Sequence, residues 1–445
     1  SVRIYYHIDL IANDLIANQL TEHMWWLILI NYKSAINLIF LPRILVHPFL
    51  LESTSHGLLL HYALPLVARV LIHVRDSTTD LGEPWFEPVS NYSDAARFQA
   101  ELTALRRMPT VFAPAASVVE PGDYLARETF GVPLFVSRGR DSRARVFRNS
   151  CRHRGAAMVD GQGCTQALVC NYHGWSYRLD GSIAHIPHAD GFPDNIADER
   201  ALVELASCEA NGLIIVAGSD GDASATSTGL DAPQLLLADT LAGHRLVTTT
   251  EEELPINWKV LIEQTLEGYH IRSAHRSTFY PVQYDNLNVI EFSGMHSRVT
   301  YPYRNIERQA TVSPAERRLR GYSTTVTHLF PNTIVSTFPE LTLVSLIDPL
   351  AIDKSLITTF MLTTAAPNPD GEEFAPDGLS LAAEGAVEDT KMSLAVQSGF
   401  RAGANDTIVF GRNESAIGHF HRNLDDTLGA GGVDASAATP VKLTP

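Results

Sequence analysis

Two short segments, each pairing a cysteine with a histidine, constrain this chain more than any other feature of its sequence. Cys151 and His153 are two positions apart, sixteen residues follow, and Cys170 and His173 are three positions apart. Thiolates and imidazoles bind zinc or iron–sulfur clusters. Zinc fingers group their ligands in pairs of one residue type, whereas each pair here mixes the two types. The mixture favours a cluster of two irons with unlike ligands.

The residues that flank these pairs carry a family resemblance. The segments CRHRG, from Cys151, and CNYHGWSYRLDG, from Cys170, resemble the Rieske domain of the large (alpha) subunit of aromatic-ring-hydroxylating oxygenases, which are Rieske non-haem iron oxygenases. The resemblance implies that Cys151 and Cys170 bind one iron of a [2Fe–2S] cluster, while His153 and His173 bind the other. It also implies that Trp175 packs beneath the cluster.

The other residues near these pairs have simpler expected roles. The resemblance implies that Gly155 and Gly174 let backbone amides approach the cluster sulfides. The remaining cysteines, Cys164 and Cys208, lie outside the pattern. We expect both to be inert core residues, because four cysteines in 445 residues do not make a disulfide scaffold.

A second group of candidate ligands lies in the segment EQTLEGYHIRSAH, residues 263–275. His270 and His275 are five positions apart, which separates them by about 140° on an ideal helix. A regular helix would therefore not direct both at one metal, but a bulge or a helix end near His270 would bring them together. Two imidazoles and one carboxylate form the facial triad of non-haem Fe(II) oxygenases, which leaves positions open for O₂.

This segment is also similar to a motif of the same family, D/E-x-Y-H-x₄-H. The similarity implies that His270 and His275 bind the mononuclear iron. It implies that Glu267, at a position where many members have Asp, bridges a Rieske histidine of a neighbouring subunit to the iron-bound histidine. Tyr269, beside the ligand, is expected to help shape the site.

The third iron ligand must come from another part of the chain. Glu388 and Asp389, at the start of the last predicted helical region, resemble the family segment that supplies it. We choose Asp389 and keep Glu388 as the alternative, although acidic residues are also common at helix N-termini. His419 and His421 lie about 160° apart on a helix, so they cannot share a metal and are expected to be surface or packing residues.

Hydrophobic periodicity and turn residues predict an α+β fold with two main domains. The first is a small antiparallel β domain, which follows a helix at 93–108 capped by Ser93 or Asp94 and has strands at 133–137, 144–147 and 213–216. The second is a helix-grip domain, an antiparallel sheet wrapped on a helix. Its predicted elements are a strand at 245–252, a helix at 257–270, strands at 288–302, 323–328, 333–338, 341–348 and 355–364, and a long helical region at 388–428.

These elements divide the chain into four parts. We expect an apolar N-terminal extension of unknown role (1–83), a Rieske domain (84–238), a catalytic iron domain (239–428) and a disordered tail (429–445). Polar loops are expected at 217–232 and 366–387. The extension contains no uninterrupted apolar run of the roughly 20 residues that a spanning helix needs. A net charge of −16 argues against a nucleic-acid partner, and we expect a cytoplasmic protein.

The family resemblance implies a function as well as a fold. It implies a terminal oxygenase, active as a homotrimer, that takes NAD(P)H-derived electrons from a reductase, directly or through a ferredoxin. With O₂ it would hydroxylate an organic, aromatic substrate at the Fe(II). The alternative reaction is monooxygenation that demethylates an N- or O-methyl compound, such as a quaternary ammonium. A substrate pocket is expected among residues 288–345 and 355–364.

Two other classes of protein compete with this interpretation. A Rieske electron carrier would need neither the His270 and His275 pair nor a second domain. A zinc-binding interaction module would use the cysteines and histidines without iron.

Overall fold

The computed structural model of the chain describes residues 66–218, 241, 243–364 and 377–430, which all fall within one compact unit. Most of the predicted extension, most of both predicted loops and nearly all of the predicted tail lie outside the described residues. Within the described part of the chain, every helix is too short or too polar to span a membrane.

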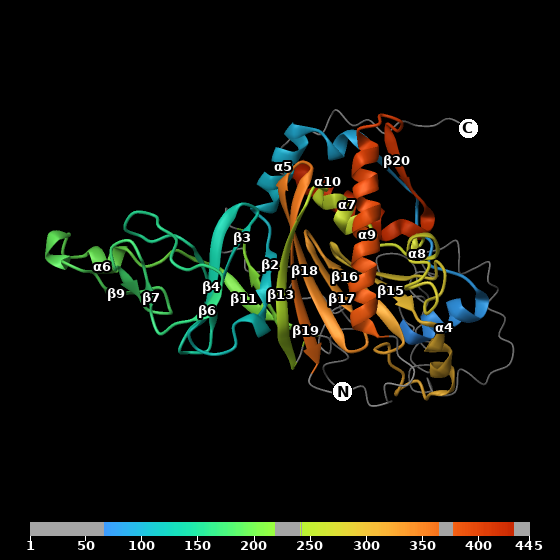
Figure 1. Cartoon of the computed structure of the whole chain (residues 1–445), viewed down its shortest axis with the longest axis horizontal. Coiled ribbons are helices and arrows are strands. Elements are labelled where there is room, and N and C mark those ends of the chain that lie inside the picture. Colours follow the sequence, from blue (N-terminus) through green and yellow to red (C-terminus); the bar gives the residue numbers. More distant parts are fainter. Residues whose placement is uncertain (1–65, 219–240, 242, 365–376, 431–445) are drawn as a thin grey trace, which may run out of the picture. The chain divides into compact units, whose positions relative to one another are not determined.

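The first main part of the fold consists of antiparallel strands (Figure 1). They form a five-stranded sheet in the order β10-β5-β4-β3-β6 and two three-stranded sheets, β11-β12-β2 and β7-β8-β9. The strands predicted at 133–137, 144–147 and 213–216 are confirmed as β4, β5 and β12. The strand bounds are β2 Thr110–Pro114, β3 Asp123–Thr129, β4 Val132–Arg138, β5 Ala144–Arg148, β6 Gln162–Cys164, β7 Leu168–Val169, β8 Ser176–Tyr177, β9 Ile183–His185, β10 Glu204–Leu205, β11 Ser207–Ala210 and β12 Leu213–Val216.

The second main part is built on a seven-stranded antiparallel sheet with the order β13-β19-β18-β17-β16-β15-β14. The strand predicted at 288–302 is a hairpin of two strands, and its turn contains Gly294 at φ 55°, a conformation that glycine adopts without strain. The strand bounds are β13 His244–Leu254, β14 Val289–Ser293, β15 His296–Pro302, β16 Ser323–Leu329, β17 Thr333–Thr337, β18 Leu341–Ala351 and β19 Lys354–Thr364.

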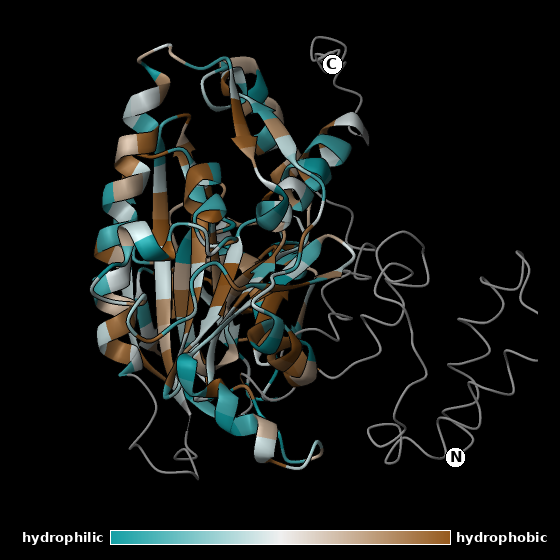
Figure 2. Ribbon diagram, turned by 90° about the vertical axis from the view of Figure 1, so that its right-hand side faces the viewer, coloured by the Kyte–Doolittle hydropathy of each residue, from teal (hydrophilic) through white to brown (hydrophobic). Residues whose placement is uncertain are grey.

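Helices cover this sheet and confirm the predicted α+β class. They are α7 Trp258–Glu263, α8 Ile271–Ala274, α9 Gly378–Phe400 and α10 Ser415–Ala430. α7 contacts β18, α10 contacts β15, and α9 lies against α7 and α8. Figure 2 shows the hydrophobic residues concentrated in the strands and on the helices beside them. The buried cluster between sheet and helices includes Trp258, Phe330 and Phe420.

Two predicted helices differ in extent from the observed ones. The helix predicted at 257–270 ends at Glu263, where the Thr265 hydroxyl bonds the carbonyl of Ile262 and Gly268 then packs tightly against Asn288. The region predicted at 388–428 is not one helix. α9 already begins at Gly378, and β20 (Thr407–Phe410) and the 3₁₀ helix η7 (Arg412–Glu414) separate it from α10.

The N-terminal elements pack on the second part of the fold. β1 (Trp85–Pro88) pairs with β20, and α5 (Ala95–Leu105) contacts α10. The predicted cap of α5 is confirmed, because Asp94 accepts a hydrogen bond from the amide of Arg97 at 2.6 Å. α4 (Leu66–Asp76), from the predicted extension, contacts β14 and η6. The shorter elements are η3 Val89–Tyr92, η4 Ala115–Ser117, η5 Ala189–Gly191, α6 Ile196–Glu199 and η6 Arg304–Thr311.

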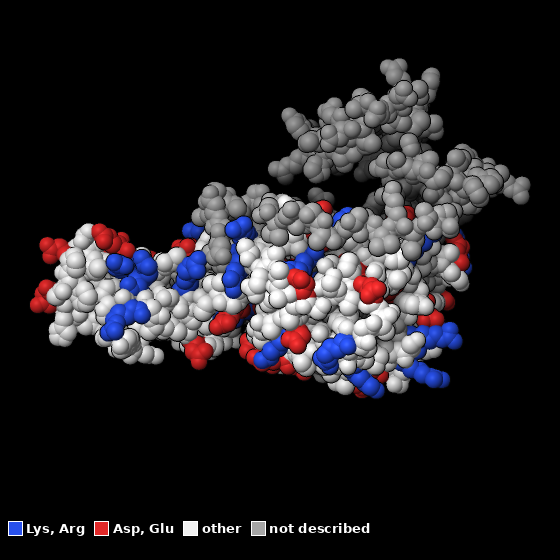
Figure 3. All heavy atoms as spheres, turned by 90° about the horizontal axis from the view of Figure 1, so that it is seen from above, with Lys and Arg blue, Asp and Glu red and all other residues white. Residues whose placement is uncertain are grey.

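Buried polar pairs fix the two parts together. Arg127 on β3 forms an ion pair with Asp348 on β18, both nearly inaccessible, and Thr110 donates to Asn332 at 2.8 Å. Burial raises the pKa of Asp348, and the Arg127 guanidinium opposes that rise. On the face in Figure 3, acidic and basic side chains are interspersed. The negative charge of the sequence therefore does not gather in one continuous area of that face.

Candidate iron centres

Both cysteine–histidine pairs lie in tight loops of the small β region. In each loop a glycine amide donates to the carbonyl of the cysteine, from Gly155 to Cys151 and from Gly174 to Cys170, both at 2.9 Å. The two glycines have φ of 83° and 77°, in the left-handed region that other residues rarely adopt. The glycine amides thus close the loops.

The four side chains are arranged as like pairs. Cys151 and Cys170 are each 3% exposed and interact with each other, and the ring centroids of His153 and His173 are 4.6 Å apart. Nδ1 of His153 is buried without a hydrogen-bond partner, which is costly unless a group outside the chain binds it. Trp175 stacks on His153, with centroids 4.9 Å apart and planes 4° apart.

Hydrogen-bond donors lie beside both sulfur atoms. Tyr177 Oη accepts a hydrogen bond from the amide of Arg152 at 3.1 Å and lies 3.4 Å from Cys151 Sγ, within reach for its hydroxyl to donate to a thiolate at that position. Burial raises the pKa of the Cys170 thiol, and the amides of Tyr172 and His173 oppose that rise by donating to the sulfur. The donor set therefore fits a [2Fe–2S] cluster, whose thiolates are stabilised by such hydrogen bonds.

The two other cysteines lie outside these loops. Cys164 on β6 is exposed, so its expected place in the core was wrong, and Cys208 on β11 is partly buried. Cys164 ends a short strand at the edge of the five-stranded sheet, where it is exposed.

The break between α7 and α8 brings His270 and His275 to one point. Their Nε2 atoms lie 3.1 Å apart, and Asp389 Oδ1 lies 2.9 Å from Nε2 of His275 and 3.5 Å from Nε2 of His270. Ligand atoms that are about 2.1 Å from one metal and at right angles are about 3 Å apart. Within the described residues, these three form the single group of His, Cys, Asp and Glu side chains whose ligand atoms are all close enough to hold one metal ion.

The position of α9 separates the two candidate carboxylates. Because α9 begins at Gly378, Glu388 and Asp389 are in its middle, and the expected helix N-terminus at these residues was wrong. Glu388 Oε2 accepts hydrogen bonds from Nδ1 of His275 at 2.8 Å and from the Thr278 hydroxyl at 2.6 Å. The geometry therefore favours Asp389 as the ligand and gives Glu388 the role of orienting His275.

Glu267 has the same relation to His270. Its carboxylate pairs with Nδ1 of His270 and accepts the amides of Tyr269 and His270. Each imidazole thus directs Nε2 toward the common point and Nδ1 toward a glutamate, which fixes its ring and tautomer. The Tyr269 side chain is 64% exposed, so it contributes its backbone to Glu267, whereas the expected role of its side chain in shaping the site has no support here.

The charges at this point suit a cation. Burial opposes protonation of His270, yet Asp389 and Glu267 raise its pKa to about 10 in the metal-free chain. Burial favours the neutral form of Asp389, but hydrogen bonds from His270 and His275 lower its pKa. A divalent metal would displace the proton from His270, as metal binding to histidine generally does.

A cavity of about 230 Å³ is lined by two of the candidate ligands, His270 and Asp389. Three further carboxylates line it, from Glu263, Glu267 and Glu414, and its apolar wall comes from α7, α9, β20 and α10. The apolar residues are Val260, Met392, Val396, Ile408, Phe410 and Ile417. The expectation that residues 288–345 and 355–364 line the pocket does not hold for this cavity.

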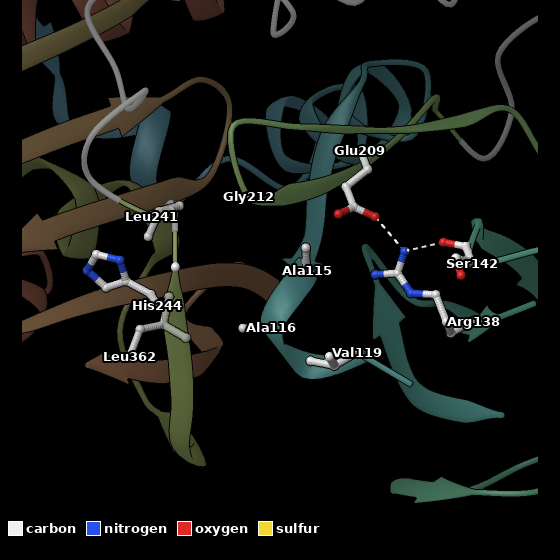
Figure 4. A pocket seen from close by; sticks show the side chains of 11 residues that line it. Ala115, Ala116, Val119, Arg138, Ser142, Glu209, Gly212, Leu241, His244 and Leu362 are labelled. Carbon is white, nitrogen blue, oxygen red and sulfur yellow. Dashed lines mark hydrogen bonds and ion pairs between the residues drawn. The ribbon is translucent and has the colours of Figure 1, made fainter. Parts of the chain in front are cut away.

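A second cavity, of about 380 Å³, lies between the small β region and β13 (Figure 4). Its charged wall is formed by Arg138, which is already paired with Glu209 at 2.7 Å and donates to the Ser142 carbonyl at 2.8 Å. The opposite wall carries His244 and Leu362. None of the candidate iron ligands lines this cavity.

Several residues near the centres were not found from the sequence. His421 was expected to be a surface or packing residue; it is fully buried, as a packing residue is, but its hydrogen bond to Glu263 was not predicted. Tyr177 and Glu263 lie in the two motif segments, but the sequence assigned no role to either. Their roles depend on contacts between distant segments, for which a single sequence carries no direct signal.

A fold with a Cys₂His₂ cluster site and a facial triad in one chain defines a class of two-centre iron oxygenases. The comparisons with known proteins agree. Residues 109–203 match the family model "Rieske [2Fe-2S] domain", and residues 241–430 match "Ring hydroxylating alpha subunit (catalytic domain)". Together the matches cover more than half of the chain. The chain belongs to the Rieske-type ring-hydroxylating oxygenase alpha subunits, and it carries domains for both iron cofactors.

Individual relatives support the same assignment. The carnitine monooxygenase oxygenase subunit of Escherichia coli (strain K12) is 29% identical over 228 residues, which are 50% of this chain and 59% of that protein. The chain is also similar to a solved structure of a quaternary ammonium Rieske monooxygenase, which is described as giving insights into carnitine oxidation and inter-subunit electron transfer. That similarity has a TM-score of 0.63 at 22% identity and covers 78% of this chain and 96% of the other. Naphthalene 1,2-dioxygenase from Rhodococcus sp. has a TM-score of 0.61 at 17% identity, with coverage of 82% and 97%. These structures share the fold.

Proposed function

We propose that this chain is the terminal oxygenase component of a system that uses O₂ and NAD(P)H-derived electrons to oxygenate a small organic substrate. The observation that carries the proposal is the presence, in one chain, of the paired Cys and His loops and of the His270, His275 and Asp389 triad. When bound, the cluster supplies single electrons and the Fe(II) activates O₂. Met392, Val396 and Phe410 give the cavity an apolar wall that excludes water from part of it.

The electron supply requires partners. We propose an NAD(P)H-dependent reductase, directly or through a ferredoxin, and a homotrimer in which Glu267 links the Rieske histidine of a neighbouring subunit to His270. Glu267 supports this because it already pairs with Nδ1 of His270 and is 11% exposed at the cavity. The structure of the related quaternary ammonium enzyme, described as giving insights into inter-subunit electron transfer, supports the same arrangement.

We place a cationic, N-methylated compound first among the substrate classes. Glu414 supports it, because this carboxylate lines the cavity and burial and Glu267 raise its pKa, as expected for crowded negative charges that a cation would relieve. The names of the carnitine and quaternary ammonium relatives support it too. Hydroxylation of an aromatic ring is the second candidate, supported by the fold shared with naphthalene 1,2-dioxygenase.

A comparison of substrates tests both the activity and the class. The iron-loaded chain with a reductase is supplied with carnitine, choline or naphthalene, and products are detected by incorporation of ¹⁸O from ¹⁸O₂. We expect oxygenation of the cations, and we expect Glu414→Gln to raise KM about tenfold for them and not for a neutral substrate. Glu384→Gln, a change at an exposed position on α9, is the control and should change neither. Turnover of naphthalene alone would reverse the order of the two classes, and no ¹⁸O product with any substrate would contradict the activity.

A further inference from the structure

A buried group of ionisable side chains stands behind the wall of the iron cavity. Glu263 on α7, which lines that cavity, accepts hydrogen bonds at one oxygen from Tyr92 Oη at 2.7 Å and from Nε2 of His421 at 2.9 Å. Nδ1 of His421, on α10, lies 3.3 Å from Glu87 on β1. Glu87 in turn accepts hydrogen bonds from the Trp85 indole at 2.8 Å and from the Asn91 amide at 2.7 Å.

The imidazole of His421 is held in one orientation between the two carboxylates. Its exposed fraction is 0%, and that of Glu87 is 1%. The ring stacks with Trp85 at 6.5 Å and 9°, and with Phe410 at 5.9 Å and 21°. An isolated buried charge is very unfavourable, so a charge on His421 or on Glu87 requires an oppositely charged partner beside it.

The charges around His421 favour its protonated form. Burial opposes the charge, but the hydrogen bonds and charges of Glu263 and Glu87 raise its pKa to about 9. Burial likewise opposes ionisation of Glu87, and His421 lowers its pKa to about 2. Burial and Glu263 raise the pKa of Tyr92, so its hydroxyl stays neutral. Lys259, a buried cation beside this group, is paired with Glu101 at 2.9 Å.

We propose that Glu263 and His421 form a one-proton store for the iron cavity. The proposal rests on the oxygenase function, since a hydroxylation, RH + O₂ + 2e⁻ + 2H⁺ → ROH + H₂O, consumes protons in a partly apolar cavity. The proton on Nε2 of His421 moves to Glu263, and the Glu263 carboxyl releases it into the cavity. His421 is left neutral and keeps its Nδ1–H toward Glu87. Between turnovers, water in the cavity reprotonates Glu263, which returns the proton to His421.

The geometry gives each residue a distinct part. Glu263 has 8% of its side chain exposed and lines the cavity, so it alone of the group can exchange a proton with the reacting atoms. His421 acts through Glu263 and is a positioning residue that also holds the proton. Glu87 sets how tightly His421 holds it. A group that only clamps α7, α10 and β1 together would change stability with pH, but it would not change the amount of peroxide that the folded enzyme releases per O₂ consumed.

The charge of His421 can be measured directly. The full chain is labelled with ¹⁵N-histidine in its metal-free form, and the imidazole of His421 is assigned by its loss in His421→Gln. We expect a cationic imidazole at pH 7.5 that titrates near pH 9, and a lower titration point in Glu87→Gln. A neutral His421 at pH 7.5 would overturn the proton store, whether or not a substrate is known.

Turnover of the iron-loaded enzyme supplies the second readout. His421→Gln should lower product formation at pH 8 about tenfold with iron and sulfide contents unchanged, recover toward the wild-type rate near pH 6, and release more peroxide per O₂ consumed. Glu87→Gln should move the alkaline limb of the pH profile to lower pH, which keeps the test decisive if His421→Gln does not fold.

His419→Gln is the control, since this neighbouring histidine packs on Phe292 instead. Unchanged pH profiles in both test variants would overturn the proposal. Absence of turnover in the wild type would count against the oxygenase function, while the NMR titration would still decide the charge of His421.

Discussion

Removal of the Glu388 carboxylate should weaken Fe(II) binding without abolishing it. Glu388 orients His275 through a 2.8 Å hydrogen bond to Nδ1 and is itself held by Thr278 at 2.6 Å. Loss of a carboxylate that orients a metal-bound histidine costs about 10–100-fold in affinity, or about 1.4–2.7 kcal/mol. Because Glu388 is 27% exposed, water partly replaces it, and we expect about 10- to 30-fold for Glu388→Ala.

The assay is an anaerobic Fe(II) titration against a competing chelator. Asp389→Ala should lose far more affinity than Glu388→Ala, because it removes a ligand atom. Glu384→Ala, an exposed change on α9, should stay within about twofold of the wild type. If Glu388→Ala abolished binding while Asp389→Ala retained it, the assignment of the two carboxylates would be reversed. If both bound Fe(II) as the wild type does, the triad itself would be wrong.

Three more predictions concern the cluster, the bridge and the buried histidine. Tyr177→Phe removes the hydroxyl beside Cys151 Sγ and should lower the reduction potential of the cluster, because hydrogen bonds to the sulfur atoms help to set that potential. The potential is measured in a redox titration, and an unchanged value would show that the hydroxyl does not act on the sulfur. Glu267→Gln should leave both metals bound but slow reoxidation of the reduced cluster in stopped-flow mixing with O₂ and substrate, and a wild-type rate would exclude the bridging role. The pKa of about 9 for His421, above about 6.5 for an unfolded chain, means that its contribution to stability is complete below pH 6.5 and is lost as the pH rises through 9. The free energy of unfolding in urea should therefore fall by about 3 kcal/mol from pH 6.5 to 9 in the wild type, and a slope equal to that of His421→Gln would contradict this.

The features that the sequence predicted well are those that depend on neighbouring residues. The two loops need a cysteine, a histidine and a glycine within five positions, and Gly155 and Gly174 indeed take the left-handed conformation that closes them. The strands followed from alternation of apolar residues, and the cap of α5 followed from Asp94. The break between α7 and α8 was anticipated near His270, because two histidines five apart cannot meet on a regular helix.

The features that the sequence did not predict depend on distant segments. α9 begins ten residues earlier than predicted, at a cap formed by Asp377, and this changes the setting of Asp389 from a helix end to a helix middle. The strand β20 could not be foreseen, because it exists through pairing with β1 at the other end of the described chain. The contact of His421 with Glu263 has the same origin, since it joins α10 to α7.

The central claim is that two iron centres share one polypeptide, and metal analysis tests it most directly. After anaerobic purification with iron and sulfide supplied, we predict about three irons and two acid-labile sulfides per chain, together with the red-brown colour and spectrum of a Rieske cluster. Asp389→Ala should yield about two irons with the sulfide unchanged. Zinc without sulfide, or two irons per chain in the wild type, would contradict the account.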